Sequence, residues 1–576
     1  MSGSSWAHDT AIRAALTLAL SLVVSAPCLA QSDAPDGSPV VLEAQSLFRF
    51  PVGGVTTSGP VVAAGRVWLL SDSKTLYVVT VDGVAVGKRS LSTRRTGFIV
   101  CDAFGRAAIS DGESGISLIN RAGQEVWRVE LGVAPTGAPI FGPDGRLYIV
   151  AGTAMVALAP NGRQLWREPL PADPCTSLAL DAGGGPMVGL LDGSIIGYTA
   201  DGARAQRPVP GGVPAVLAEG GGTVLAAMAD GRLIVMPPPD SATAPVVPKV
   251  VSLGARPIAA AAGSDGFYVL SALGSLVCVD TEGAERWRTT ARLDGGPAAL
   301  EAYRDRAVVL TRSAVYSYGL DGSEYRVLRL RNAVSTPAMS PNGTVFAGGA
   351  DWIMYAYRFE RGLSALAEPS PPRFDMARID AVAKEESLWS FSPSDDSSMM
   401  NRLADIEKSI GSGTIGEETV DAALYMSAAA MGRMEAPFGS GASVPAPTPR
   451  GAMPRAYACN LLGMLGLAQA VPILVMIFER DKDPAVRAAA AAAIAAIGLD
   501  PEGLAMEAFA RATDGGRLDA QAALAVVDAI DSLYRANGAL EDRSGILALV
   551  RISGGNYSRV VRSRAEQALK RVSSAQ

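Results

Sequence analysis

The chain has 576 residues, of which 48% are apolar and 19% are charged, and its 51 basic and 57 acidic residues leave a formal net charge of −6. At roughly 150 residues per domain, this length predicts two to four domains. No segment carries a long run of one charge, which argues against a DNA- or RNA-binding protein. The only histidine, His8, lies in a segment that we expect to be removed. Mechanisms and metal sites that need imidazole are therefore excluded from the mature chain.

Residues 1–30 have the pattern of a secretory signal peptide. Arg13 supplies the positive charge, the apolar run extends from Ala14 to Val24, and we expect cleavage after Ala30. The run is about half as long as the twenty or so residues that span a membrane. A lipid anchor on Cys28 is the alternative, which we do not favour because a proline directly before it fits a lipobox poorly. We expect an exported protein, periplasmic or envelope-associated, without a transmembrane segment in the mature chain.

Four cysteines remain in the mature chain. Cys101, Cys175, Cys278 and Cys459 are widely spaced and form no CxxC or vicinal pair. This pattern predicts neither a disulfide framework nor a metal site. Apolar surroundings of three of them favour inert, buried thiols.

An internal repeat of about 40 residues dominates the first two thirds of the chain. Polar turns that end in glycine recur at intervals of 40, 39, 40, 81 and 39 residues, at Gly83, Gly123, Gly162, Gly202, Gly283 and Gly322. A second series of turns has a similar spacing, at Gly65, Gly105, Gly145, Gly185, Gly222, Gly266, Asp305 and Gly343. Short β-rich runs lie between these turns, and glycine permits the positive φ of tight hairpins.

Each unit is therefore predicted to be four antiparallel strands, and eight units predict an eight-bladed β-propeller over residues 43–362. The last unit supplies three evident strands, and an additional strand at 46–52 precedes the first unit. We expect this strand to complete the last blade and close the ring, which removes the open sheet edges.

Three units place a tryptophan four residues after the outer glycine. The fullest unit runs from Asp280 through Gly283 to Trp287 and resembles the PQQ-like (quinoprotein-like) propeller repeat, Asp-x-x-Thr-Gly-x-x-x-Trp. The resemblance implies that the tryptophan docks between neighbouring blades. The residues that carry this signature are Gly83, Gly123, Trp127, Gly162, Trp166, Gly202, Asp280, Gly283, Trp287 and Gly322.

The PQQ-like repeat occurs in quinoprotein dehydrogenases and in a protein-binding subunit of the outer-membrane β-barrel assembly machinery. This chain lacks the adjacent cysteines and long insertions that the dehydrogenases carry, so the resemblance favours the protein-binding kind. A calcium site at Asp111 and Glu113 lacks enough ligands, and we interpret these residues as a turn. A phosphate loop at residues 83–88 lacks the required spacing and helix. We expect no catalytic residue, cofactor or metal.

Alanine-rich helical patterning follows the propeller, and we expect a multidomain β and α protein. The predicted segments are a linker at 363–374, a helical region at 375–435, a flexible Pro/Gly/Ser loop at 436–451 and HEAT-like helical repeats at 452–573. Helices are expected at 375–388, 399–410 and 417–431, and three to four stacked helix pairs are expected after the loop.

The HEAT-like resemblance rests on Asp483, Pro484 and Arg487, which match the Asp-Pro and Arg that open the second helix of such a repeat. Near the C-terminus, basic residues gather at Arg551, Arg559, Arg562, Arg564, Lys570 and Arg571. We interpret this cluster as an ordinary solvated helix face rather than as an anion-binding patch for an acidic partner or anionic lipid.

These patterns lead to one functional hypothesis and two alternatives. The hypothesis is an exported, non-catalytic scaffold or adaptor of the bacterial cell envelope that binds partner proteins through its propeller and HEAT-like surfaces. One alternative is a quinoprotein-type dehydrogenase with PQQ and calcium, or a sugar-binding propeller. The other is a purely structural component of the envelope without a discrete partner.

Overall fold

The computed structural model describes residues 39–574, apart from single positions and the segments 92–96, 200–201, 209–211, 237–250, 361–362, 364–373, 389–392, 413–418, 432–450 and 539–542. The predicted signal peptide with His8 and Cys28, most of the predicted linker and nearly all of the predicted Pro/Gly/Ser loop lie outside the described residues.

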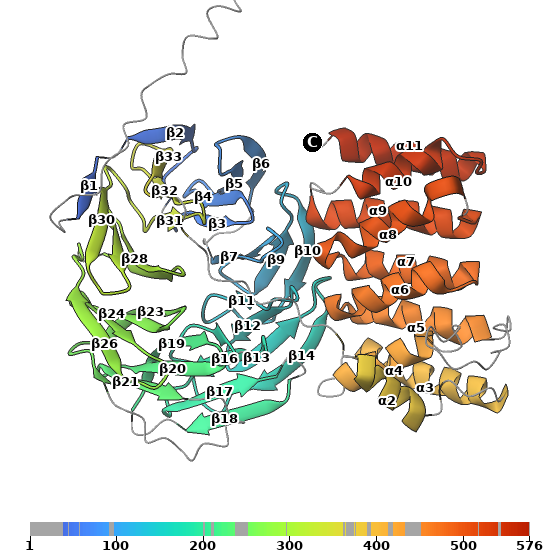
Figure 1. The fold of residues 1–576 in the computed structure, drawn as a ribbon, viewed down its shortest axis with the longest axis horizontal. Helices are drawn as coiled ribbons and strands as arrows, with labels where there is room; N and C mark the ends of the chain where they lie inside the picture. The colour runs from blue at the N-terminus through green and yellow to red at the C-terminus, as the bar shows by residue number, and fades with distance from the viewer. Residues whose placement is uncertain are drawn as a thin grey trace, which may run out of the picture.

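The described strands form eight sheets arranged as the blades of a ring (Figure 1), which confirms the predicted eight-bladed propeller. Strands of blades 1 and 2 are β3 (Val61–Ala63), β4 (Arg66–Leu70), β5 (Thr75–Thr80), β6 (Ala85–Ser90), β7 (Ile99–Cys101), β8 (Ala107–Ser110), β9 (Gly115–Ile119) and β10 (Glu125–Glu130). Those of blades 3 and 4 are β11 (Ile140–Phe141), β12 (Leu147–Ala151), β13 (Ala154–Leu158), β14 (Gln164–Pro169), β15 (Ala179–Leu180), β16 (Pro186–Gly189), β17 (Ser194–Tyr198) and β18 (Arg204–Pro208).

The second half of the ring repeats the pattern. Blades 5 and 6 contain β19 (Pro214–Gly220), β20 (Thr223–Met228), β21 (Arg232–Met236), β22 (Val251–Ser252), β23 (Pro257–Gly263), β24 (Gly266–Ser271), β25 (Ser275–Val279) and β26 (Glu285–Thr290). Blades 7 and 8 contain β27 (Ala298–Ala302), β28 (Arg306–Thr311), β29 (Ala314–Gly319), β30 (Glu324–Arg329), β31 (Ala338–Met339), β32 (Thr344–Gly348) and β33 (Ile353–Arg358).

The N-terminal strands close the ring. Strand β2 (Ser46–Pro51) pairs antiparallel with β33 and becomes the outer strand of blade 8, as the sequence predicts. Strand β1 (Val40–Leu42) was not anticipated: it pairs parallel with β30 and adds a fifth strand to blade 7. The N-terminal strands therefore belong to two consecutive blades, 7 and 8.

Ten α-helices follow in the described residues. They are α2 (Met376–Glu385), α3 (Pro393–Ser412), α4 (Thr419–Met431), α5 (Ala452–Leu465), α6 (Val471–Arg480), α7 (Pro484–Ile497), α8 (Leu504–Ala512), α9 (Ala520–Asn537), α10 (Ser544–Ser553) and α11 (Arg559–Ser574). Helix α3 begins at Pro393, six residues before the expected start at 399. A proline fits there because the first turn of a helix does not use its backbone N–H.

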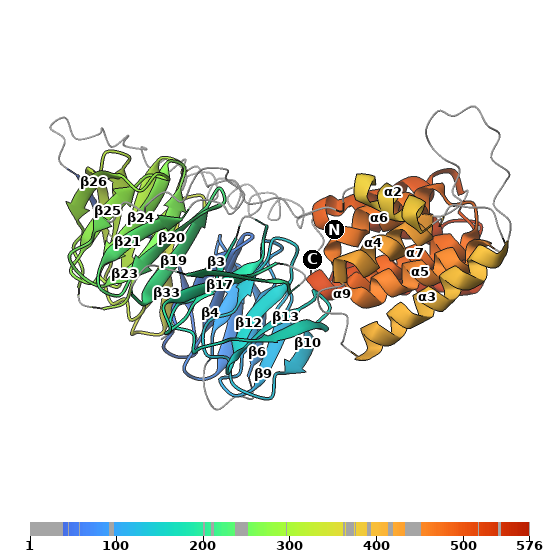
Figure 2. The same ribbon diagram turned by 90° about the horizontal axis from the view of Figure 1, so that it is seen from below.

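The helices alternate between two layers (Figure 2). Helices α3, α5, α7, α9 and α11 form one layer, and α2, α4, α6, α8 and α10 form the other. The helices before the predicted loop therefore belong to the same stack as those after it. None of the helices in the described part of the chain is both long and apolar enough to cross a membrane.

Candidate functional site

The signature residues hold the propeller blades together. Each outer-turn glycine has a positive φ, between 79° and 93°. The tryptophan of one blade lies against the outer glycine of the next: a Cβ atom would lie 2.7 Å from the Trp127 ring at Gly162 and 2.7 Å from the Trp287 ring at Gly322. Trp166 contacts Gly202 in the same way. The three signature tryptophans therefore pack against the next blade.

Blades without the tryptophan use other contacts. Gly87 occupies the tryptophan position in blade 1, and a Cβ atom there would lie 2.5 Å from the Ala122 backbone oxygen of blade 2. At the closing seam, the ring of Phe48 from β2 packs on Gly83 of blade 1. The contact with the outer turn of the next blade is therefore made by an aromatic ring in some blades and by backbone atoms in another.

The three HEAT-like signature residues join α6 to α7. Asp483 is the N-cap of α7 and accepts from the Ala485 backbone N–H at 2.8 Å, and Pro484 is the first helical residue. The Arg487 Nε donates to the Phe478 carbonyl at 3.0 Å, at the end of α6. The capping follows the expected order, while the HEAT-like assignment itself stays a prediction.

The calcium and phosphate-loop candidates of the sequence lie in turns of the propeller. Asp111 accepts from the backbone N–H groups of Glu113 and Gly115 and pairs with Arg128 at 2.7 Å, as a turn former does. The segment that resembles a phosphate loop forms a turn and strand β6, and the next element in the described residues is strand β7. Among the described residues, no group of three or more His, Cys, Asp or Glu side chains could hold a metal ion. The absence of a cofactor or metal stays a prediction.

Burial raises the pKa of each of the four cysteine thiols. The pKa rises to about 11 at Cys175 and Cys278. Cys101 and Cys459 shift in the same direction for the same reason. A raised pKa leaves little thiolate near neutral pH, which agrees with inert thiols.

Three helix C-termini meet the propeller at turns of blades 2 and 3, a contact that the sequence did not reveal. The Asn120 Nδ2 donates to the Arg535 carbonyl at 2.8 Å at the end of α9. The Asn161 Nδ2 donates to the Ala496 carbonyl at 3.4 Å in α7, and the Arg163 Nη1 to the Met464 carbonyl at 3.0 Å in α5. Last-turn carbonyls of a helix lack intrahelical partners and carry partial negative charge, so these donors satisfy and complement them.

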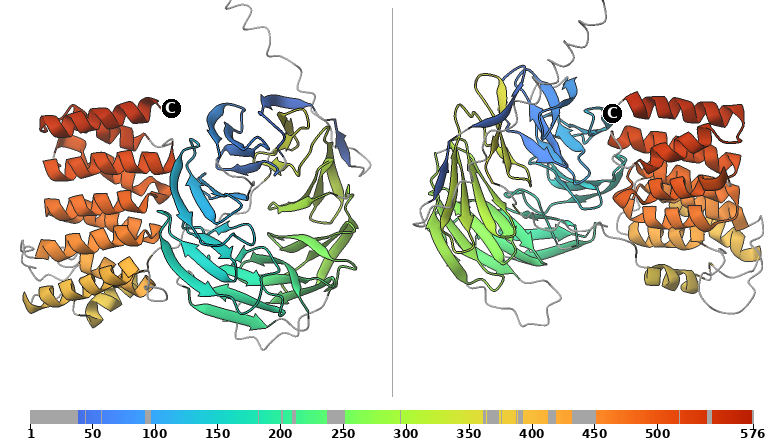
Figure 3. Two further views of the ribbon diagram at one scale, coloured as in Figure 1. Left: turned by 180° about the vertical axis from the view of Figure 1, so that it is seen from behind. Right: turned by 45° about the horizontal axis from the view of Figure 1, so that its top comes forward.

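Apolar side chains also pack across this contact between the helix C-termini and blades 2 and 3, which we call the joint. They connect the core of the propeller with the core of the helical stack. One cluster of buried side chains includes Tyr148 and Trp166 of blade 3 and the interior of the helical stack. A Cβ atom at Gly145 would lie 2.6 Å from the Leu499 Cδ1, so the blade backbone and the helical stack are in direct contact. The buried Arg146 donates to the Gln469 Oε1 at 3.2 Å. The helical stack is therefore fixed beside blades 2 and 3 (Figure 3).

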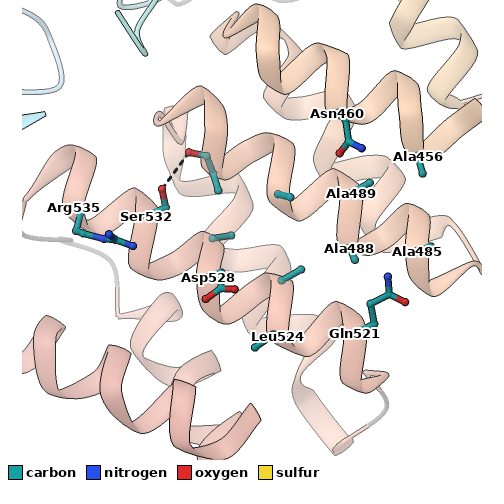
Figure 4. Close-up of a pocket in the computed structure, with 14 residues that line it drawn as sticks. Ala456, Asn460, Ala485, Ala488, Ala489, Gln521, Leu524, Asp528, Ser532 and Arg535 are labelled. Carbon is teal, nitrogen blue, oxygen red and sulfur yellow. Dashed lines mark hydrogen bonds between the residues drawn. The ribbon is translucent and has the colours of Figure 1, made fainter. Parts of the chain in front are cut away.

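A groove of about 650 Å³ crosses the layer that contains α5, α7 and α9. Its floor is α7, which contributes only alanine side chains to it. Asn460 of α5 and Gln521 of α9 stand on opposite walls (Figure 4). Arg535 lies at the end next to the propeller, since its own carbonyl accepts from Asn120.

A second groove of about 640 Å³ continues the first toward α3. The two share Ala456, Asn460 and Ala485. We call their combined lining the helix groove. It includes Tyr457, whose hydroxyl donates to the Glu407 carboxylate, and this hydrogen bond raises the pKa of Tyr457 to about 12. The tyrosine therefore stays protonated and neutral at physiological pH.

In the basic cluster near the C-terminus, three of the six residues form ion pairs. Arg564 pairs with Asp528 at 2.8 Å, and Arg571 pairs with the buried Asp531 at 2.8 Å. Arg551 pairs with Asp514 at 3.1 Å. These pairs support the interpretation of a solvated helix face over that of an anion-binding patch.

Comparison with known proteins identifies the type of propeller repeat. Residues 112–244 match the family model described as outer membrane protein assembly factor BamB, so the chain carries the PQQ-like propeller repeat. BamB from Moraxella catarrhalis has 17% identity over 55% of this chain and 98% of its own, with a TM-score of 0.43. The C-terminal WD40 domain of Sif2 has 10% identity over 56% and 99%, with a TM-score of 0.45. Saccharomyces cerevisiae Sqt1 has 12% identity over 56% and 100%, with a TM-score of 0.44. The curated proteins include no match to this chain.

Proposed function

We propose that the chain is an exported, non-catalytic scaffold of the bacterial cell envelope that binds a partner protein in the helix groove. The observation that carries this proposal is the groove itself, an open alanine-floored channel across adjacent helices whose C-termini are fixed to the propeller. A rigid groove limits the conformational entropy that is lost when a partner binds.

The envelope role draws support from the BamB family match and from the signal-peptide pattern of residues 1–30. The non-catalytic role draws support from the roles of the signature residues: the tryptophans pack blades, the glycines make turns and Asp483 caps a helix.

The test is capture of partners by the tagged, full-length chain in its native cells after mild crosslinking, with quantitative mass spectrometry. Ala492→Arg places a long charged side chain on the groove floor, and Ala381→Arg places the same side chain on an exposed position of α2, away from the groove. A stoichiometric envelope protein that is lost with the first variant and kept with the second supports the proposal. Absence of any partner, together with stabilisation of the purified chain by calcium and PQQ, would favour the dehydrogenase alternative.

A further inference from the structure

We propose that the occupant of the helix groove is an α-helix of the partner protein, lying along α7 with its acidic N-terminal end at the propeller. This inference rests on the proposed function, because it specifies what the groove binds. It is argued from the shape, the hydrogen-bonding groups and the charges of the groove.

The shape of the groove suits a helix. Packed helices lie about 8–10 Å apart, so the axes of α5 and α9, which flank α7, are separated by about 16–20 Å. A helix with its side chains is about 10 Å wide and fits between these walls over a floor of alanines. Helix α7 has 14 residues, which corresponds to about 21 Å or four turns of a bound helix. A single extended strand would be too narrow to contact both walls.

The hydrogen-bonding groups also favour a helix over an extended segment. The floor side chains are all alanine and offer no donor or acceptor. On the walls, Asn460 and Gln521 each carry one exposed carboxamide. An extended backbone would leave most of its N–H and C=O groups without protein partners along this floor, whereas a helix pairs them internally.

The charges give the bound helix a direction. Asp483 lines the groove at the end far from the propeller, and Arg535 lines the end beside it. The Arg535 side chain is 63% exposed and pairs with the buried Asp531 at 2.9 Å. Because Arg571 pairs with the same carboxylate, the group keeps a net positive charge. Asp528 lies between them and pairs with Arg564 at 2.8 Å. Helices favour acidic residues in the first turn and basic residues in the last. A partner helix with its N-terminus at Arg535 complements both ends, and its dipole runs opposite to that of α7.

The test places a photocrosslinking amino acid at Ala485, Ala492 or Ala495 of the full-length chain in its native cells, with Ala381 as the control position. We expect at least tenfold more crosslinking from the three groove positions, all to one partner segment whose crosslinked residues lie on one helix face, three, four or seven apart. Ala495 should reach the N-terminal end of that segment and Ala485 its C-terminal end. A synthetic peptide of the segment should bind the purified chain at least tenfold more weakly after Ala492→Arg, and equally well after Ala381→Arg.

The outcomes separate this inference from the proposed function. Crosslinked residues two apart, a proline within the segment or the reverse direction would overturn the helix inference while the groove keeps its binding role. A partner that the full-length chain captures but that crosslinks from none of the three groove positions would also overturn it and leave the scaffold role in place. Absence of any partner in the capture experiment would remove the scaffold and this inference together.

Discussion

At the residue scale, the contact between Trp287 and Gly322 is open to a direct test. Gly322 has a φ of +79°, and a Cβ atom there would lie 2.7 Å from the Trp287 Cε3. Gly65 has a similar φ of +72°, but a Cβ atom there would meet nothing within 4 Å. An alanine in the left-handed region costs roughly 1 kcal/mol, and overpacking adds about 1–3 kcal/mol.

Gly322→Ala should therefore lower the free energy of unfolding by about 2–4 kcal/mol, and Gly65→Ala by about 1 kcal/mol. Urea denaturation of the two variants measures the difference. Equal losses would mean that the tryptophan does not press on the turn of the next blade.

Glu301 on β27 gives the propeller a pH dependence. Burial raises its pKa to about 6, against the opposing effect of hydrogen bonds from the Tyr303 hydroxyl at 2.8 Å and from the Met339 backbone. The folded state therefore holds this proton more tightly than the unfolded state does. The contribution to stability is complete below the ordinary carboxyl range and is lost as the pH rises through about 6.

Glu301→Gln should remove this pH-dependent loss of stability. As the pH rises from 4.5 to 7, the free energy of unfolding of the variant should therefore gain up to about 2 kcal/mol relative to that of the wild type. Chemical denaturation across that range measures it. The same substitution at Glu43, which is 93% exposed, serves as the control. Parallel pH profiles of the wild type and Glu301→Gln would contradict the prediction.

At the element scale, a buried ion pair fixes α5 to the turn between α6 and α7. The Arg455 Nε lies 2.8 Å from the Asp481 Oδ2, and both side chains are at most 3% exposed. Asp481 also accepts from the Asp483 backbone N–H at 2.9 Å. Removing one partner of such a pair leaves an uncompensated buried charge, whereas removing both charges is often nearly neutral.

Arg455→Met should lower the free energy of unfolding by about 3–5 kcal/mol. Adding Asp481→Asn, which keeps an acceptor for the Asp483 N–H, should recover a substantial part of this loss. Calorimetric unfolding of both variants checks the order. A double variant that is less stable than Arg455→Met would show that the amide is not accommodated there.

The sequence predicts elements better than contacts between them. The glycine turns repeat every 40 or so residues because each hairpin needs a positive φ, so the eight blades follow from that spacing. The closing role of β2 follows from the strand that the last unit lacks. Strand β1 cannot be predicted in the same way, because it has only three residues and pairs in parallel, without a hairpin turn to mark it. The helix groove cannot be predicted from the sequence, because the alanines of α7 are compatible both with close helix packing and with an exposed groove floor. Only the arrangement of α5 and α9 shows which of these alanines are covered.

At the scale of the whole molecule, two asparagines couple the propeller to the helical stack. Asn120 stands where the fullest repeat has Asp280, and the Oδ1 atoms of both accept from backbone N–H groups two and four residues on. Asn161 and Asp321 also occupy equivalent positions in their blades, and the Oδ1 of each accepts from the backbone N–H two residues later. Only the asparagines have an Nδ2 donor for the helix ends.

Asn120→Asp combined with Asn161→Asp should therefore keep both turns but replace two donors by charges that the helix C-termini repel, at a cost of about 1–2 kcal/mol each. The matched control is Asp280→Asn combined with Asp321→Asn, which makes the opposite exchange in blades 6 and 7. Hydrogen exchange reports the joint directly, because the Arg121 N–H donates to the Asn537 carbonyl at 3.3 Å. We expect exchange at Arg121 to become at least tenfold faster in the first variant and to stay unchanged in the control. Unchanged exchange in both would mean that apolar packing alone holds the joint, and the groove would keep its orientation without these donors.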